Sequence, residues 1–302
     1  MSATVYRLER GSLESFCAAV FHIHGLSPED ATIASKVLVE ADALGIPSHG
    51  LGRLRRYVEG LETGLMRPDA QAEIVAETPS SLLLDAHGAM GAPVSERAMR
   101  IVIEKARTSG AAFASVRDSN HFGIAGHYAR MALKEDMLGI AMTNTAALGV
   151  PTFGSAVMYG TNPIAFAAPA GRETSFVLDM STTVVSRGKI EVHERLGRDI
   201  PEGWAVDSRG AATTAPGPLL RDMQDNAGGG ILPLGGRGKD FGGHKGYGLA
   251  VMVDILCALL GGAAFGPRIR DSETSSARVS HFFGAIRIAS FRDPEDFKRD
   301  MD

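Results

Sequence analysis

The sequence predicts an α/β protein in which a helical N-terminal part precedes a layered domain built on a mixed sheet. Two observations predict it. Apolar residues recur at helical spacing over the first 45 residues, and from Ile74 onward short apolar runs alternate with amphipathic stretches. We therefore expect a helical domain over residues 1–75 and a mixed α/β domain over residues 76–302.

The composition supports a folded core and excludes several classes of partner. The 302 residues are 44% hydrophobic and 22% charged, which is typical of a globular chain. A net charge of −4, with scattered lysines and arginines, gives no basic surface for nucleic acid or an anionic membrane. The segment Met1–Arg7 lacks the apolar core of a signal peptide, and no apolar run reaches the ~20 residues needed to cross a bilayer. We expect a cytoplasmic protein without nucleic-acid or membrane partners.

The two cysteines and two of the histidines do not predict a metal site. Cys17 and Cys257 lie far apart in the chain, so they form no disulfide framework and no cysteine-based zinc site. His22 and His24 are two residues apart and point to different faces of a helix. We expect both cysteines to be buried and both histidines to lie on the surface or in packing contacts.

Helix signals are clearest in the N-terminal part. After a first helix, Ser27 is followed by Pro28 and acidic residues, a typical helix start. A third helix is predicted from Ser48 to Gly64. In the α/β part we predict strands over 81–85, 112–116, 138–145, 164–168, 176–180 and 281–290, helices over 93–109, 124–136 and 247–260, and a glycine-rich loop over 228–248 that covers a site or is merely flexible.

The stretch from Asp42 to Arg56 contains the first candidate for chemistry. Ser48 is placed to cap the third helix, which puts His49 in its first turn and Arg53 on the same face. A base beside a guanidinium suits oxidation of a 2-hydroxy acid, because one group takes the hydroxyl proton while the other holds the carboxylate. The alternative is that Ser48 is only a cap and His49 an ordinary half-buried side chain.

A second candidate histidine follows a predicted strand. His121 lies between the strand that ends at Val116 and the helix that starts near Ile124, and Gly123 allows the backbone to come close to a ligand. His121 is therefore an acid–base or cofactor-contact candidate, or a packed histidine near its own helix.

Three further positions carry weaker signals. Thr161 lies in a polar turn. Asp179 ends an apolar strand, where a buried carboxylate needs a partner such as a histidine; the alternative is that Asp179 caps a helix. Lys245 follows Gly242-Gly243-His244 at a predicted helix start, where backbone N–H groups hold phosphate well. The chain contains neither a P-loop nor a Gly-x-Gly-x-x-Gly sequence, so a dinucleotide would not bind in the usual Rossmann manner.

Taken together, these stretches resemble the malate/L-lactate dehydrogenase family of the non-Rossmann type, which includes ureidoglycolate and sulfolactate dehydrogenases, diketogulonate reductase and piperideine-carboxylate reductase. The resemblance covers nearly the whole chain in order. The matching segments are 41–53, 119–123, 138–145, 160–169, 176–189, 200–207 and 244–250.

The resemblance implies a homodimer that binds NAD or NADP in an extended pose on an unusual mixed sheet, near the subunit interface. It implies that His49 transfers the proton with support from Ser48 and Asp179, that Arg53 holds the substrate carboxylate, and that Thr161 contacts the substrate. His121 matches a histidine that is the proton acceptor in some members and a cofactor or substrate contact in others. Implied cofactor contacts are His121, Phe122, Gly123, Thr145, Asp179, Met180, Ser181, His244 and Lys245.

The chain differs from the family in one respect. It ends at Asp302, whereas family members generally continue for some tens of residues near the cofactor. We expect cofactor affinity to be the property that this difference affects most.

Three alternative functions remain open. The same residues would serve a reductase of a cyclic imine carboxylate or a diketo sugar acid. A hydrolase of Ser48, His49 and Asp179 is disfavoured, because Gly-x-Ser-x-Gly is absent and adjacent residues at a helix start point apart. The third alternative is a cofactor-binding protein without turnover.

Overall fold

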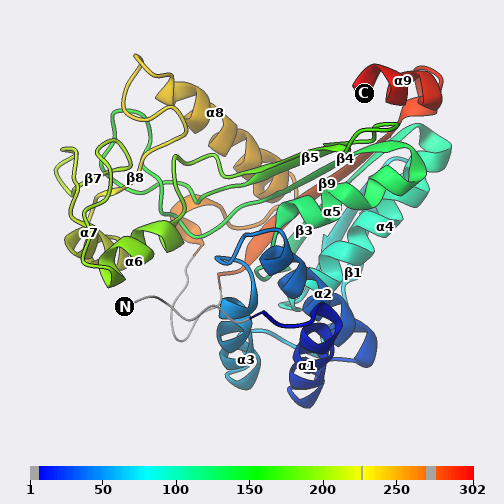
Figure 1. The fold of residues 1–302 in the computed structure, drawn as a ribbon, viewed down its shortest axis with the longest axis horizontal. Coiled ribbons are helices and arrows are strands. Elements are labelled where there is room, and N and C mark those ends of the chain that lie inside the picture. The colour runs from blue at the N-terminus through cyan, green and yellow to red at the C-terminus, as the bar shows by residue number, and fades with distance from the viewer. Residues whose placement is uncertain (1–6, 226, 270–276) are drawn as a thin grey trace.

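A seven-stranded mixed sheet forms the centre of the molecule and confirms the predicted fold class (Figure 1). The structure is a computed structural model that describes residues 7–225, 227–269 and 277–302. Among the sheet neighbours only β2 and β3 run parallel, and helix α4 connects them. In spatial order the strands are β1 (Glu73–Glu77), β2 (Ser81–Asp85), β3 (Ala111–Ser119), β9 (Val279–Arg287), β4 (Met137–Thr143), β5 (Ile164–Ala168) and β6 (Phe176–Met180).

Helices cover both faces of the sheet. Helices α4 (Gly91–Ser109) and α5 (Ala125–Met131) pack on one face, and α8 (Gly243–Asp254) with its π-helical extension Ile255–Leu259 packs on the other. Because side chains alternate along a strand, β9 serves both layers: Phe283 packs toward α4 and α5, and Phe282 packs toward α8.

The N-terminal helices have a buried core of their own. Helices α1 (Arg10–Ile23), α2 (Pro28–Ala43) and α3 (Leu54–Glu62) bury a cluster that includes Cys17 and Phe21. Ser27 caps α2 through the backbone N–H of Asp30, as its sequence predicts. Both cysteines are buried and free, as expected. The predicted helical segment also includes residues 1–6, which lie outside the described residues, and the domain division near residue 75 stays a prediction.

Polar contacts join these helices to the sheet layer. The His127 ring on α5 contacts the carboxylates of Glu40 on α2 and Glu96 on α4. Arg130 on α5 pairs with the second oxygen of Glu40. This charged cluster holds α2 against the segment that follows His121.

A third buried cluster, which the sequence did not predict, lies in a small lobe. It comprises β7 (Ala205–Val206), β8 (Gly230–Ile231), α6 (Arg187–Arg195) and α7 (Pro216–Gln224), packed around Ile190. These elements are short and polar on one side, so their apolar periodicity is weak.

Several predicted boundaries are wrong. The strand predicted over 281–290 spans Val279–Arg287 and is followed by a 3₁₀ turn. The helix predicted over 124–136 ends at Met131 and continues as a 3₁₀ turn. The loop predicted over 228–248 contains strand β8, and α8 already begins at Gly243, because glycines there fit closely against the backbone of residues 234–236.

The short helix α9 (Pro294–Met301) begins after Asp293, whose side chain caps it. In the described part of the chain no helix is long and apolar enough to cross a membrane.

Candidate active site

The loop between α2 and α3 carries Ser48 and His49, and its geometry corrects the predicted cap. The chain re-enters helix as a 3₁₀ turn at Leu51 and as α3 at Leu54, and Ser48 caps neither. The carboxylate of Asp42 accepts a hydrogen bond of 2.7 Å from the Leu51 N–H instead. Gly50 lies against that carboxylate, where a Cβ would come within 2.0 Å of an Asp42 oxygen.

Ser48 and His49 contact each other, contrary to the expectation that they point apart. The Ser48 hydroxyl lies 2.9 Å from His49 Nδ1. Such contact is possible because both residues precede the helix, so helical geometry does not separate their side chains. Burial, followed by the nearby Arg53 guanidinium, lowers the pKa of His49 to about 4, so its imidazole is neutral at pH 7.

Arg53 is held by the same loop. Its Nε donates a 2.7 Å hydrogen bond to the Ser48 carbonyl. Within the described residues its two terminal nitrogens have no hydrogen-bond partner. Arg53 lies close enough to His49 to lower its pKa, although the two do not share the helix face that was predicted, and the fork of the guanidinium is available for a carboxylate.

His121 lies beside His49. The two rings stack with centroids 5.4 Å apart and planes inclined by 24°. The Gly123 N–H donates to His121 Nδ1 over 3.3 Å, and the buried Tyr57 hydroxyl lies 2.6 Å from the same nitrogen. Acceptance of the Gly123 N–H by Nδ1 favours the tautomer with the proton on Nε2, in which the Tyr57 hydroxyl also donates to Nδ1.

The His121 ring is neutral for electrostatic reasons as well. Burial, then the neighbouring His49 and Arg53, holds the pKa of His121 well below its usual range. Gly123 is needed here because its φ is +84° and a Cβ would come within 2.5 Å of Val37 Cγ1. The site thus combines two neutral imidazoles with the guanidinium of Arg53, and the charge of Arg56 also acts on His121.

The candidate contacts that follow β4, precede β5 and follow β6 form one continuous network. The Thr145 hydroxyl accepts from the Thr161 N–H at 3.0 Å, and the Thr145 N–H donates to the Asn162 side chain at 3.2 Å. The Thr182 N–H and hydroxyl both donate to the Thr161 carbonyl. Ser181 bonds the carbonyl of Thr183, so its hydroxyl lies at the edge of the same network.

The N-terminus of α8 adds donors for an anion. Gly242 precedes the helix in a left-handed conformation, and no side chain caps the helix. His244 and Lys245 are exposed in its first turn, and Lys245 has no ion-pair partner within the described residues. Uncapped N–H groups, a lysine and the hydroxyl of Thr145 fit the phosphates and polar groups of a dinucleotide.

The resemblance implies that Asp179 supports His49, but in the structure the Asp179 carboxylate binds another group. Its carboxylate accepts a 2.7 Å hydrogen bond from the Gly126 N–H at the start of α5. No hydrogen bond joins it to Ser48 or His49 in the described part of the chain. Met180 is in register with Ile164 on β5. The three side chains of the hydrolase alternative are therefore not assembled as a triad.

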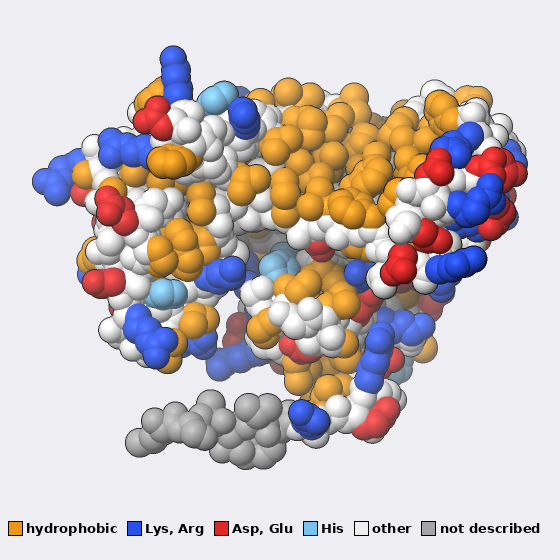
Figure 2. Space-filling view, turned by 45° about the horizontal axis from the view of Figure 1, so that its top comes forward, with side chains coloured by type: hydrophobic (Ala, Val, Ile, Leu, Met, Phe, Trp, Pro, Cys, Tyr) orange, Lys and Arg blue, Asp and Glu red, His pale blue; other side chains and the backbone are white. Residues whose placement is uncertain are grey.

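The surroundings place this group of residues between two parts of the molecule. A Cβ on Gly188 of α6 would lie 3.8 Å from Ser48, so the small lobe faces the His49 loop. Figure 2 shows the molecule hollowed between the lobe and the N-terminal helices, with histidine at the border of the hollow.

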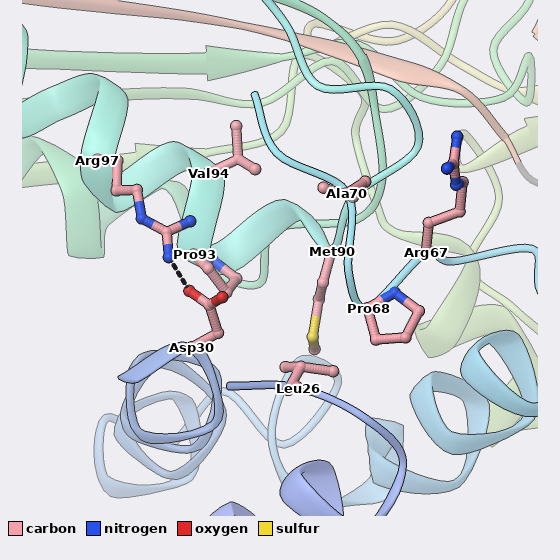
Figure 3. Close-up of a pocket in the computed structure, with 10 residues that line it drawn as sticks. Leu26, Asp30, Arg67, Pro68, Ala70, Met90, Pro93, Val94 and Arg97 are labelled. Atoms are coloured by element: carbon pink, nitrogen blue, oxygen red, sulfur yellow. Dashed lines mark hydrogen bonds and ion pairs between the residues drawn. The ribbon is translucent and has the colours of Figure 1, made fainter. Parts of the chain in front are cut away.

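A separate crevice between α2 and α4 is too small for a substrate (Figure 3). It is lined by Leu26 and Met90 and bordered by the ion pair of Asp30 with Arg97. Its cavity volume of about 10 Å³ is the space of one water molecule.

Two site residues had not been predicted from the sequence. Tyr57 on α3 contacts His121. His281 on β9 stacks against Phe122, with the centroids of these two rings 4.5 Å apart. Tyr57 follows Arg53 by one helical turn, which is the one sequence signal that could have found it. His281 occurs in an apolar strand, where nothing in the sequence distinguishes it from a packed histidine.

The fold and the site together bring two buried imidazoles and the Arg53 guanidinium to a mixed sheet, in a sequence without the Rossmann fingerprint. The sequence profile described as malate/L-lactate dehydrogenase matches residues 8–302. The chain therefore belongs to the malate/L-lactate dehydrogenase family, a family of oxidoreductases, which confirms the resemblance.

Individual relatives agree with this assignment. The chain is 45% identical to a malate dehydrogenase of Pyrococcus abyssi over 98% of its own length and 80% of the relative. It is 32% identical to a Δ1-pyrroline-2-carboxylate/Δ1-piperideine-2-carboxylate reductase of Pseudomonas putida over 87% of its length and 74% of the relative. The crystal structure of a malate dehydrogenase from Entamoeba histolytica superposes with a TM-score of 0.94 at 30% identity, covering 99% of this chain and 83% of that one.

Proposed function

We propose that the protein is an NAD- or NADP-dependent oxidoreductase that interconverts a small 2-hydroxy acid, such as malate or L-lactate, and its 2-oxo acid. The observation that carries the proposal is the neutral His49 beside Arg53, whose terminal nitrogens have no partner within the described residues. The malate dehydrogenases among the relatives support the substrate class.

Each residue has a distinct task in this reaction. Arg53 binds the substrate carboxylate and thereby fixes the carbon that carries the hydroxyl. His49 takes the hydroxyl proton, and the carboxylate on Arg53 offsets the positive charge that would otherwise oppose protonation. A base of this kind contributes about 10²- to 10⁴-fold to the rate.

The hydrogen bonds divide the work between the two histidines. His121 presents Nε2–H, because Tyr57 and Gly123 both donate to its Nδ1. That ring is therefore placed to donate a hydrogen bond to the substrate oxygen, and we assign the role of base to His49. Ser48 orients His49 through its hydroxyl.

The cofactor would lie along the network described above. When bound, its nicotinamide supplies the hydride acceptor for the substrate carbon. We assign its binding to Thr145, Ser181, the start of α8 with His244 and Lys245, and the segment of Phe122. The assignments of Thr161 to the substrate and of Asp179 and Met180 to the cofactor follow the family resemblance.

We also propose that the chain acts as a homodimer. Figure 2 shows hydrophobic side chains gathered over the face of the molecule that carries α8. Extended exposed apolar surface of this kind usually marks an interface. The exposed apolar side chains of α8, its extension and the residue that follows are Val251, Ile255, Leu259 and Leu260.

The deciding experiment measures reduced-nicotinamide absorbance while the purified protein meets a panel of 2-hydroxy acids with NAD and with NADP. Turnover with one acid that falls at least 100-fold in His49→Ala would establish the reaction, the cofactor and the base. Absence of turnover with every acid would contradict the proposal.

A second candidate function is reduction of a cyclic imine carboxylate, which the Pseudomonas putida relative favours. The same assay run with Δ1-pyrroline-2-carboxylate and reduced cofactor tests it. Turnover of the imine without turnover of any 2-oxo acid would replace the first proposal with the second.

A further inference from the structure

His281 is fully buried beneath the candidate site, and no role described so far uses it. It has 0% exposure and lies near the start of β9, between β3 and β4. Its Nδ1 is 2.8 Å from the Thr143 hydroxyl on β4, and its Nε2 is 2.9 Å from the Ser119 hydroxyl on β3. One imidazole therefore links the ends of the two strands that lead into the site.

The hydrogen bonds of Thr143 favour one tautomer of the His281 ring. The Thr143 hydroxyl lies 3.0 Å from two carbonyl oxygens, those of Asn144 and Ser280. Because a carbonyl only accepts, the Thr143 hydroxyl donates to a carbonyl and accepts from His281 Nδ1–H. In this tautomer Nε2 accepts from the Ser119 hydroxyl, and the ring also hydrogen-bonds to the backbone of Asn120. Burial lowers the pKa of His281 to about 3, so this neutral form persists at working pH.

The ring face makes a third contact. Phe122 stacks on His281 with centroids 4.5 Å apart and planes inclined by only 5°. Ser119 and Phe122 lie on either side of His121 in the chain, so His281 holds both ends of the short segment that carries His121. A bulge in β3 just before Ser119, with Asp118 at φ +52°, brings this segment over the ring.

We propose that His281 is a positioning residue that fixes His121 against the substrate oxygen through Ser119 and Phe122. The inference rests on the proposed function, because it assigns His281 to the same acid–base site. Only a neutral histidine meets all three demands, since phenylalanine would keep the stacking alone and glutamine would keep a hydrogen bond alone. Through Thr143 the same ring ties His121 to the strand that leads to Thr145.

The test uses two serines of one strand. Ser119→Ala removes the hydroxyl that donates to His281, and Ser115→Ala is the matched control, because Ser115 is also buried on β3 and donates its one side-chain hydrogen bond to Cys257 O at 3.2 Å. We expect Ser119→Ala to lower kcat about tenfold with the KM of the acid within twofold, since Arg53 is untouched. We expect Ser115→Ala to keep kcat within twofold. Equal kcat in both variants would overturn the inference.

A second measurement does not depend on activity or on cofactor. Nitrogen NMR of the cofactor-free protein reports the proton position on each imidazole. We expect His281 to carry Nδ1–H and to show no titration between pH 5 and 9, and we expect Ser119→Ala, but not Ser115→Ala, to change the proton position or raise the titration midpoint of His121. An unchanged His121 in Ser119→Ala would refute the positioning role.

The two hypotheses fail separately. If the wild-type protein turns over neither hydroxy acid nor imine, the proposed function fails, while the NMR result still decides whether His281 orders His121. If the wild-type protein is active and Ser119→Ala behaves as Ser115→Ala does, the positioning role fails alone.

Discussion

Replacing Tyr57 with phenylalanine tests the role assigned to His121. The substitution keeps the buried ring and removes the hydroxyl that lies 2.6 Å from His121 Nδ1. The Gly123 N–H remains, so the Nε2–H form loses one of its two supporting hydrogen bonds. A neutral hydrogen bond is worth about 0.5 to 1.5 kcal/mol, which corresponds to about a two- to tenfold loss. We expect kcat to fall by that factor while the KM of the acid, which depends on Arg53, stays within twofold.

The control is Tyr159→Phe. Tyr159 is also buried and donates its hydroxyl over 2.9 Å, but to the carbonyl of Val150, whose N–H bonds Ile231 of the small lobe. Both variants should lose about 1 kcal/mol of unfolding free energy in a denaturant titration, while only Tyr57→Phe should lose kcat. Burial raises the pKa of Tyr57 to about 12, so the difference should be constant from pH 6 to 9. A Tyr57→Phe enzyme with wild-type kcat, or with a loss confined to KM, would refute the reasoning.

Three further predictions concern other parts of the structure. Arg53→Lys should raise the KM of the acid about tenfold to hundredfold in steady-state assays, because a lysine cannot form the bidentate contact; an unchanged KM would exclude Arg53 as the carboxylate ligand. The pKa of His127 is raised from 6.5, since Glu40 and Glu96 outweigh its burial, so its ion pairs contribute stability below pH 6.5 that is lost as pH rises through the raised pKa. Denaturant titrations should show this decline in the wild type and not in His127→Gln, and parallel curves would contradict it. Leu259→Glu on the apolar face should convert a dimer to a monomer in light scattering, and a monomeric wild type would remove the dimer proposal.

The sequence was sufficient for the fold class, whereas the roles of the site residues stay a prediction. Apolar periodicity predicted the principal helices and strands, because α2, α4 and β4 bury continuous apolar faces. The pairing of His49 with Arg53 also followed from local spacing, although their loop is not the helix start that was predicted. The polar side chain that serves that turn is Asp42, which is distant in sequence from the N–H that it binds.

Contacts that depend on strand order could not be predicted in the same way. His281 meets Ser119 and Thr143 only because β9 lies between β3 and β4, and the sequence contains no signal for that order. The small lobe was missed because its strands are only two residues long. The partner of Asp179 proved to be the Gly126 backbone, which no side-chain pattern reveals.

The position of β9 also constrains how the chain can fold as it is made. The strand is the last of the sheet in sequence, yet it lies in the middle, between β3 and β4. Until the ribosome has released Arg287, strands β1–β3 and β4–β6 can form only two separate half-sheets, each with an unpaired edge that invites association with other chains. Closure requires pairing across more than a hundred residues, which is slow. We therefore expect nascent chains to need protection at these edges until β9 pairs with β3 and β4.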